Sequence, residues 1–163
     1  MTIILVGILV SQCRRPWGWL GRRVARAMNI THSRLTDWGL GHVAVQKDHT
    51  ILDVGCGGGE TVHKLAALAS DGKVYGIDYS KASVATSRIR NAQLIQAGRV
   101  AIGHGSVSHL PFPDRTFDLV TAVETHLSAH EHSRSLSTAG YSDVEIRVEA
   151  RNRWLCAIAR RPA

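Results

Sequence analysis

The sequence lacks several features that mark other classes of protein. No apolar stretch reaches the roughly 18 residues that a membrane-spanning helix needs. The chain has only three cysteines, Cys13, Cys56 and Cys156, with no CxxC pair, so neither a disulfide framework nor a zinc or iron–sulfur site is expected. Internal repeats and low-complexity tracts are also missing. A chain of 163 residues, 44% apolar and 20% charged, instead predicts one globular domain of ordinary size in the reducing cytoplasm.

Acidic side chains are missing from the first 34 residues, which carry six arginines: Arg14, Arg15, Arg22, Arg23, Arg26 and Arg34. The acidic residues all lie in residues 35–163, where they nearly balance the remaining basic ones, so most of the net charge of +7 belongs to the start of the chain. We therefore predict a basic N-terminal arm over residues 1–34, with an amphipathic helix from Pro16 to Met28, and a domain over residues 35–163. The charge is compatible with contact to nucleic acid or an anionic membrane, and equally with a solvated helix face.

Strand and helix patterns alternate along the chain from Thr50 onward. Strands are predicted at Thr50–Val54, Lys73–Ile77, Val100–Ile102 and Phe117–Val123, and helices at Glu60–Ser70, Ser80–Ala97 and Leu127–Ala139. Thr31–Gly41 is a turn-rich connector with a short helical centre. Period-two patterns at Asp143–Glu149 and Arg153–Arg160 predict a closing antiparallel hairpin. This order predicts an α/β domain whose parallel sheet is joined by crossover helices.

The first strand runs directly into a glycine-rich segment, DVGCGGGE at Asp53–Glu60. Such a turn lets the backbone pass close to a ligand, with the N–H groups of the following helix facing it. Its glycines are spaced G-x-G-x-G, whereas a dinucleotide fingerprint has its third glycine where Glu60 stands. The carboxylate of Asp53 suits a ligand that carries an ammonium group rather than phosphates. A nicotinamide oxidoreductase is therefore disfavoured.

Further candidate binding residues follow the second and third strands. Asp78 ends the second strand, where a carboxylate can accept both ribose hydroxyls of a nucleoside. Tyr79 can lie against an adenine ring or simply pack, and Ser106 with Val107 would reach the edge of the base. Because open α/β sheets bind ligands at the carboxyl ends of their strands, these residues are expected to share one site.

Three segments in this order, DVGCGGGET, YGIDYS and GSVSHLPFPDRTFDLVTAVETH, resemble the motifs of class I S-adenosylmethionine-dependent methyltransferases. The similarity covers Ile51 to His126 and points to the small-molecule branch that includes ubiquinone and menaquinone biosynthesis enzymes. It implies a Rossmann-like three-layer α/β/α sandwich, with a mostly parallel sheet and a C-terminal antiparallel hairpin. It also implies S-adenosyl-L-methionine as cofactor and methyl transfer to an oxygen, nitrogen or carbon of a small-molecule acceptor.

The resemblance assigns roles to particular residues. The glycines of the loop would approach the methionine part of the cofactor, Asp53 would help to hold its amine, and Asp78 would bind the ribose. The family often carries an acid where Ser106 stands, so the serine is expected to make a weaker contact to the adenine amine. The full predicted cofactor-binding set is Asp53, Gly55, Cys56, Gly57, Gly59, Asp78, Tyr79, Ser106, Val107 and Val123.

The chain departs from the family pattern after Val123. Residues Glu124 to Ser142 leave room for one helix, whereas the family fold places a further helix, a fifth parallel strand and another helix there. We therefore predict that the fifth strand is missing and that the strand Phe117–Val123 has an unpaired edge. Either the hairpin pairs with that edge, or a second copy covers it in a homodimer, or the fold is marginally stable.

Glu124 and His126, just past the fourth strand, are the candidate catalytic bases, because an oxygen or nitrogen acceptor benefits from proton removal. Structural roles for both side chains are equally compatible with the sequence. His126, His130 and His132 form a cluster with Glu131. His126 and His130 are one helical turn apart and could share a metal, but this spacing without a third ligand at a fixed position is a weak signal, so no metal is predicted. The alternative function is a shortened, catalytically weak or inactive cofactor-binding module, with RNA or membrane contact through the arginine-rich arm.

Overall fold

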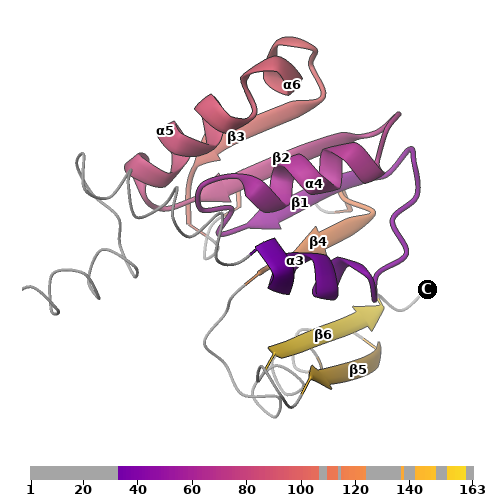
Figure 1. Ribbon diagram of the computed structural model, residues 1–163. Coiled ribbons are helices and arrows are strands. Elements are labelled where there is room, and N and C mark those ends of the chain that lie inside the picture. The colour runs from indigo at the N-terminus through magenta and orange to yellow at the C-terminus, as the bar shows by residue number, and fades with distance from the viewer. Residues whose placement is uncertain are drawn as a thin grey trace, which may run out of the picture. The chain divides into compact units, whose positions relative to one another are not determined.

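The computed structural model describes residues 33–106, 110–113, 115–123, 137, 142–149 and 154–160. This part of the chain forms two compact units (Figure 1). The first contains Val45–Val123, and the second contains Arg34–Ala44 together with the C-terminal strands. The predicted helix at Pro16–Met28 lies outside the described residues, as does the one at Leu127–Ala139 apart from Ser137.

The first unit is built on a four-stranded parallel sheet in the order β3-β2-β1-β4. Its strands are β1 (Thr50–Val54), β2 (Lys73–Asp78), β3 (Val100–His104) and β4 (Leu119–Thr121). The short apolar runs are buried in its centre, where Ile51 pairs with Val74 and both are fully enclosed. The predicted parallel sheet with crossover connections is therefore confirmed.

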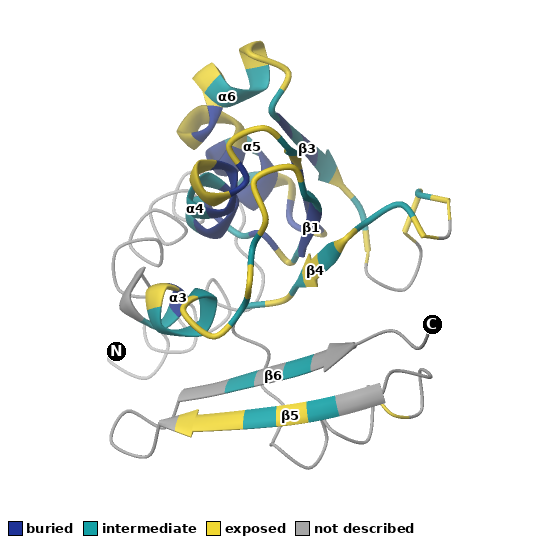
Figure 2. Cartoon of the chain, turned by 90° about the vertical axis from the view of Figure 1, so that its right-hand side faces the viewer, coloured by how far each residue is buried: buried dark blue, intermediate teal, exposed yellow. Residues whose placement is uncertain are grey.

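Helices cover one face of this sheet. Helix α4 (Glu60–Leu68) connects β1 to β2, while α5 (Lys81–Arg90) and α6 (Ala92–Gln96) connect β2 to β3. Figures 1 and 2 show α4 and α5 on the same face. Gly76 of β2 permits this close packing, because a Cβ atom there would lie 3.0 Å from Val62 Cγ2 of α4.

The opposite face of the sheet carries an aromatic cluster. Tyr75 alternates with Val74 and Gly76 along β2, so its side chain points away from the helices. Its ring packs edge-on against Phe112 and Phe117, with both centroid distances 5.5 Å. The loop before β4 is thereby fixed against the sheet.

The predicted single helix at Ser80–Ala97 is wrong, because Asn91 divides it into α5 and α6. Asn91 adopts φ −109° and ψ 18°, which are not helical values. Its side-chain amide donates to the carbonyl oxygens of Ser87 and Gly59, each at 3.0 Å. Asparagine commonly interrupts helices in this way, since its side chain competes for backbone partners.

The fourth strand is also shorter than the predicted Phe117–Val123. Only Leu119–Thr121 pair with β1, in register with Ile51–Asp53. Phe117 belongs instead to the aromatic cluster, and the carboxylate of Asp118 accepts the backbone N–H of Thr50 at 2.7 Å.

Arg99 caps the end of α4 from the start of β3. Its guanidinium donates through Nε to the carbonyl of Gly72 at 2.9 Å and through Nη2 to the carbonyls of Ala66 and Ala69. The last carbonyls of a helix have no partner within the helix, so Arg99 supplies donors at this end, where the carbonyl of Ala69 also accepts the N–H of Gly72 at 3.2 Å.

The second unit contains α3 (Ser33–Leu40) and an antiparallel hairpin of β5 (Ser142–Glu149) and β6 (Trp154–Arg160). Both the hairpin and the helical centre of the connector are confirmed. The thiol of Cys156 lies 3.9 Å from the carbonyl of Gly39. Burial raises the pKa of this thiol, which favours its protonated form at neutral pH.

Each of the two units contains its own sheet. In the first unit β4 pairs with β1 and is the last strand of the four-stranded sheet, and in the second unit β5 and β6 pair with each other. Which of the three predicted alternatives applies to β4 stays a prediction. Val120 of β4 is 51% exposed.

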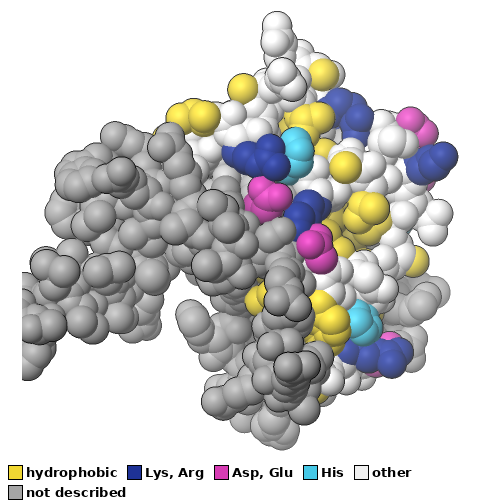
Figure 3. Space-filling view, viewed as in Figure 1, with side chains coloured by type: hydrophobic (Ala, Val, Ile, Leu, Met, Phe, Trp, Pro, Cys, Tyr) yellow, Lys and Arg dark blue, Asp and Glu magenta, His cyan; other side chains and the backbone are white. Residues whose placement is uncertain are grey.

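Charged side chains are mixed on the visible face of the described chain. Figure 3 shows acidic and basic groups side by side rather than a patch of one sign. This agrees with the nearly balanced charge of residues 35–163. Among the helices in the described ranges, none has the length and apolar character to cross a membrane.

Candidate functional site

The candidate site lies where β1 and β2 end. These strands are parallel and in register, with Asp53 beside Gly76 and Val54 beside Ile77. Their carboxyl ends therefore lie at one edge of the sheet (Figure 1). The glycine loop begins directly after β1, and Asp78 is the last residue of β2.

Left-handed backbone conformations shape the glycine loop. Gly55, Gly57 and Gly59 have φ values of +73°, +52° and +85°, which side chains other than glycine rarely adopt. A Cβ atom at Gly55 would meet no atom within 4 Å, whereas one at Gly59 would lie 2.6 Å from Asn91 Nδ2. The loop is thus open at its start, where a ligand could approach, and tightly packed at its end.

Backbone hydrogen bonds fold the loop over the end of β2. The N–H groups of Gly55 and Cys56 both donate to the carbonyl of Ile77, at 2.8 and 3.1 Å. Gly59 N–H donates back to Cys56 O at 2.9 Å, closing the turn that leads into α4. This places the loop directly beside Asp78.

Asp78 is 7% exposed and is held by two backbone donors. Its Oδ2 accepts the N–H of Gly57 at 2.9 Å, and its Oδ1 accepts the N–H of Ser80 at 2.8 Å. Each carboxylate oxygen can accept a further hydrogen bond. Asp78 therefore orients the loop and can still receive hydroxyl donors from a ligand.

Asp53 is a buried carboxyl group at the same edge, 1% exposed. Burial raises its pKa to about 7, because the charged form loses its hydration. The 2.7 Å hydrogen bond from the hydroxyl of Thr121 lowers this pKa, and the nearby Asp78 raises it. A positive charge bound beside this buried carboxyl group would favour its ionised form. The site therefore suits a ligand that carries an ammonium group.

Cys56 lies within the loop but turns its side chain inward. It is 6% exposed, and its Sγ lies 4.0 Å from the hydroxyl of Ser87. Burial, followed by the charges of Asp53 and Asp78, raises the pKa of the thiol far above its usual range. The side chain therefore acts in packing, not as a nucleophile.

The segment after Asp78 is fixed by β3. Tyr79 has a 46% exposed side chain, and its carbonyl is joined to His104 Nε2 by a hydrogen bond of 2.9 Å. The backbone N–H of Gly105 donates to the carbonyl of Asp78 at 3.1 Å. Ser106 follows directly after this contact.

Three of the predicted site residues, Val107, Glu124 and His126, lie outside the described residues. Val123 follows β4 and is half-buried. The sequence pattern does not identify Thr121 as a site residue, because its contact with Asp53 depends on the register of β4 against β1. The same applies to His104, which lies beside Asp78.

A shallow groove lies away from these strand ends. It runs between α5, α6 and β3, with a mainly apolar lining: Arg88, Ala92, Ile95, Gln96, Val100, Ala101 and Ile102. The guanidinium of Arg88 is occupied there, since its Nε and Nη2 both donate to the carbonyl of Ile102. Within the described ranges, no three His, Cys, Asp or Glu side chains gather as a metal site would require.

An open parallel sheet with a glycine turn and two carboxyl groups at its strand ends defines a Rossmann-like nucleoside-binding domain. A family model described as "Methyltransferase domain" matches residues 51–140, and the chain belongs to this family.

Curated relatives also match part of the chain. A demethylmenaquinone methyltransferase of Geobacillus sp. (strain WCH70) is 41% identical over 80 residues, covering 47% of this chain and 33% of the relative. A 27-O-demethylrifamycin SV methyltransferase of Amycolatopsis mediterranei (strain S699) is 34% identical over 93 residues, covering 57% and 34%. The matched region thus spans about a third of the length of these relatives.

Solved structures share the fold. A SAM-dependent methyltransferase from Aquifex aeolicus aligns with a TM-score of 0.67 at 15% identity, covering 85% of this chain and 96% of that chain. The likeness confirms the predicted Rossmann-like α/β fold.

Proposed function

We propose that this chain is an S-adenosyl-L-methionine-dependent methyltransferase that transfers a methyl group to an oxygen, nitrogen or carbon of a small-molecule acceptor. The observation that carries the proposal is the pair of buried carboxyl groups, Asp53 and Asp78, on either side of a glycine loop that is open at Gly55. Membership of the methyltransferase domain family supports it.

The cofactor would be held mainly by the ends of β1 and β2. Asp78 would accept the ribose hydroxyls with the oxygen lone pairs that its two backbone donors leave free. Asp53 would attract the amine of the methionine part, and the glycine loop would contact that same part. Tyr79, Ser106 and Val107 would surround the adenine, and Val123 would border the site beyond β4.

The bound cofactor would supply an activated methyl group on its sulfonium sulfur. The protein would then mainly have to align an acceptor with that methyl group and exclude water. Glu124 and His126 are the proposed bases for an acceptor that must lose a proton.

The named relatives, a demethylmenaquinone and a 27-O-demethylrifamycin SV methyltransferase, make these two compounds the first acceptors to test. A homodimer formed through the β4 edge is the proposed assembly, since Val120 is exposed on that strand. Cytoplasmic location is proposed from the cysteine pattern. Nucleic acid and anionic membranes are less favoured partners.

Calorimetric titration with S-adenosylhomocysteine tests the cofactor proposal, with NAD as the control ligand. We expect micromolar binding of one S-adenosylhomocysteine per chain and none of NAD. Transfer of a labelled methyl group from S-adenosylmethionine to either acceptor would then test the activity. A folded protein that does not bind S-adenosylhomocysteine would contradict the proposal, and binding without transfer to any acceptor would favour the alternative of an inactive module.

A further inference from the structure

The end of α5 is in direct contact with the last glycine of the loop. A Cβ atom on Gly59 would lie 2.6 Å from Asn91 Nδ2 and 2.9 Å from the Cα atom of Ser87. These residues are about 30 positions apart in sequence, so the contact joins two crossover connections of the sheet. The position of the loop therefore depends on α5 as well as on the strands.

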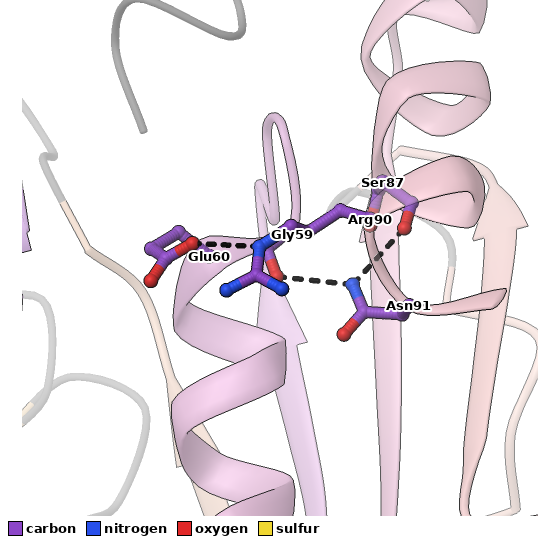
Figure 4. Close-up of polar contacts among 5 residues, drawn as sticks. All are labelled: Gly59, Glu60, Ser87, Arg90 and Asn91. Carbon is purple, nitrogen blue, oxygen red and sulfur yellow. Dashed lines mark hydrogen bonds and ion pairs between the residues drawn. The ribbon is translucent and has the colours of Figure 1, made fainter. Parts of the chain in front are cut away.

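Asn91 makes this contact specific. Its side chain is 1% exposed, and its Nδ2 donates to Gly59 O and to Ser87 O, both at 3.0 Å (Figure 4). Both amide hydrogens are thus used to join the loop to α5. The buried Oδ1 atom of Asn91 has no hydrogen-bond partner among the described residues, so the contribution of this side chain comes from its donors.

A second link lies beside the first. Arg90 Nε forms an ion pair with Glu60 Oε2 at 3.0 Å, which joins the first residue of α4 to the last residue of α5 (Figure 4). These side chains are 38% and 21% exposed, so solvent weakens the attraction. The pair supports the contact, whereas the buried amide determines its geometry.

The segment from the end of β2 to the end of α5 therefore holds the glycine loop at two points. Asp78, just before α5, holds the N–H of Gly57, and Asn91, just after α5, holds the carbonyl of Gly59. Glycines have wide conformational freedom, so a loop of this composition needs such anchors to present one arrangement to a ligand.

We propose that Asn91 is a positioning residue for cofactor binding, which fixes the Gly59 peptide and thereby the part of the loop that faces the methionine moiety. The inference rests on the proposed binding of S-adenosylmethionine. Asn91 does not touch the cofactor in this account; it acts through Gly59.

The variant Asn91→Asp tests the inference, because it keeps the shape of the side chain but places oxygen atoms against the two carbonyls. We expect the affinity for S-adenosylhomocysteine to fall about tenfold, since a loosened loop must be ordered on binding. The affinity for 5′-methylthioadenosine, which has no amino-acid part, should change less than twofold. If Asn91→Asp does not fold, Asn91→Ala removes the same donors without adding an oxygen.

A matched control separates positioning from general destabilisation. Val84→Ala removes buried apolar atoms from the same helix, at a residue that is 5% exposed and whose side chain has no hydrogen-bonding group. It should lower the melting temperature and leave both affinities unchanged. An Asn91 variant that weakens both ligands equally, or neither, would overturn the proposal.

Hydrogen exchange tests the anchor without a ligand. The amides of Gly59 and His63 donate to Cys56 O and Gly59 O, and both should exchange faster in the Asn91 variants than in Val84→Ala. Unchanged exchange would overturn the inference. If the unaltered protein fails to bind S-adenosylhomocysteine, the proposed function fails, and the role of Asn91 in cofactor binding falls with it even if exchange shows that the anchor exists.

Discussion

Replacing Asp53 with asparagine should stabilise the fold at alkaline pH while weakening cofactor binding. Burial raises the pKa of Asp53 from 3.8 to about 7 in the folded protein. The unfolded chain therefore ionises this group at a lower pH than the folded protein does. The protonated carboxyl group of Asp53 therefore contributes to the stability of the fold. This contribution is fully present below about pH 4 and is lost as the pH rises through 7.

The size of the effect follows from the difference in pKa. A difference of about three corresponds to at most about 4 kcal/mol of unfolding free energy, since each pKa unit is worth about 1.4 kcal/mol. Asparagine has nearly the same shape, cannot ionise, and can still accept the hydrogen bond from Thr121. Asp53→Asn should therefore be more stable than the unaltered protein at pH 8, by up to this amount.

Denaturant unfolding at pH 5 and pH 8 measures this difference. The advantage of Asp53→Asn should be larger at pH 8 than at pH 5, whereas Asp48→Asn, which changes an exposed carboxylate, should show little difference between the two values. An equal effect of Asp53→Asn at both pH values would refute the reasoning, as would a less stable variant at pH 8.

Ionisation of Asp53, which lowers the stability of the fold, should strengthen cofactor binding. The amine of S-adenosylhomocysteine favours the charged carboxylate, so the affinity of the unaltered protein should rise by about tenfold from pH 6 to pH 8. In Asp53→Asn the affinity should be weaker, and its remaining pH dependence should reflect only the other groups. Titration calorimetry at both pH values measures this, and a parallel pH dependence in the two proteins would count against the role of Asp53.

Three further substitutions test separate parts of the account. Asp78→Ala should weaken S-adenosylhomocysteine binding by about 1–3 kcal/mol in calorimetry, and unchanged affinity in a folded variant would refute its placement at the ribose. Arg99→Met should lower the unfolding free energy by about 2–3 kcal/mol in denaturant titration, because it removes the hydrogen bonds from Arg99 to the carbonyls of Gly72, Ala66 and Ala69. Arg115→Gly should raise the melting temperature, since Arg115 has φ +61° and relief of that conformation is worth about 1 kcal/mol.

The sequence predicted the parts of the fold that depend on local pattern. The strand Thr50–Val54 and the glycine turn after it follow from composition within a few residues, and so does the closing hairpin. Asp78 could be placed near the loop because parallel strands bring their carboxyl ends together. These features need no knowledge of distant contacts.

The break at Asn91 could not be predicted in the same way. The segment Ser80–Ala97 has good helical composition, and the interruption depends on the carbonyl of Gly59, which is distant in sequence. The pKa of Asp53 likewise depends on burial and on a register that brings Thr121 beside it. The roles of Glu124 and His126 remain predictions.

The most direct test of the cofactor site is an NMR titration of the isotope-labelled protein with S-adenosylhomocysteine. We predict that the amide signals of Gly55, Gly57, Asp78 and Tyr79 shift and saturate together, while those of the hairpin strands β5 and β6 change little. Shifts confined to the hairpin, or no saturable shift at the ends of β1 and β2, would contradict the proposal that these strand ends hold the cofactor.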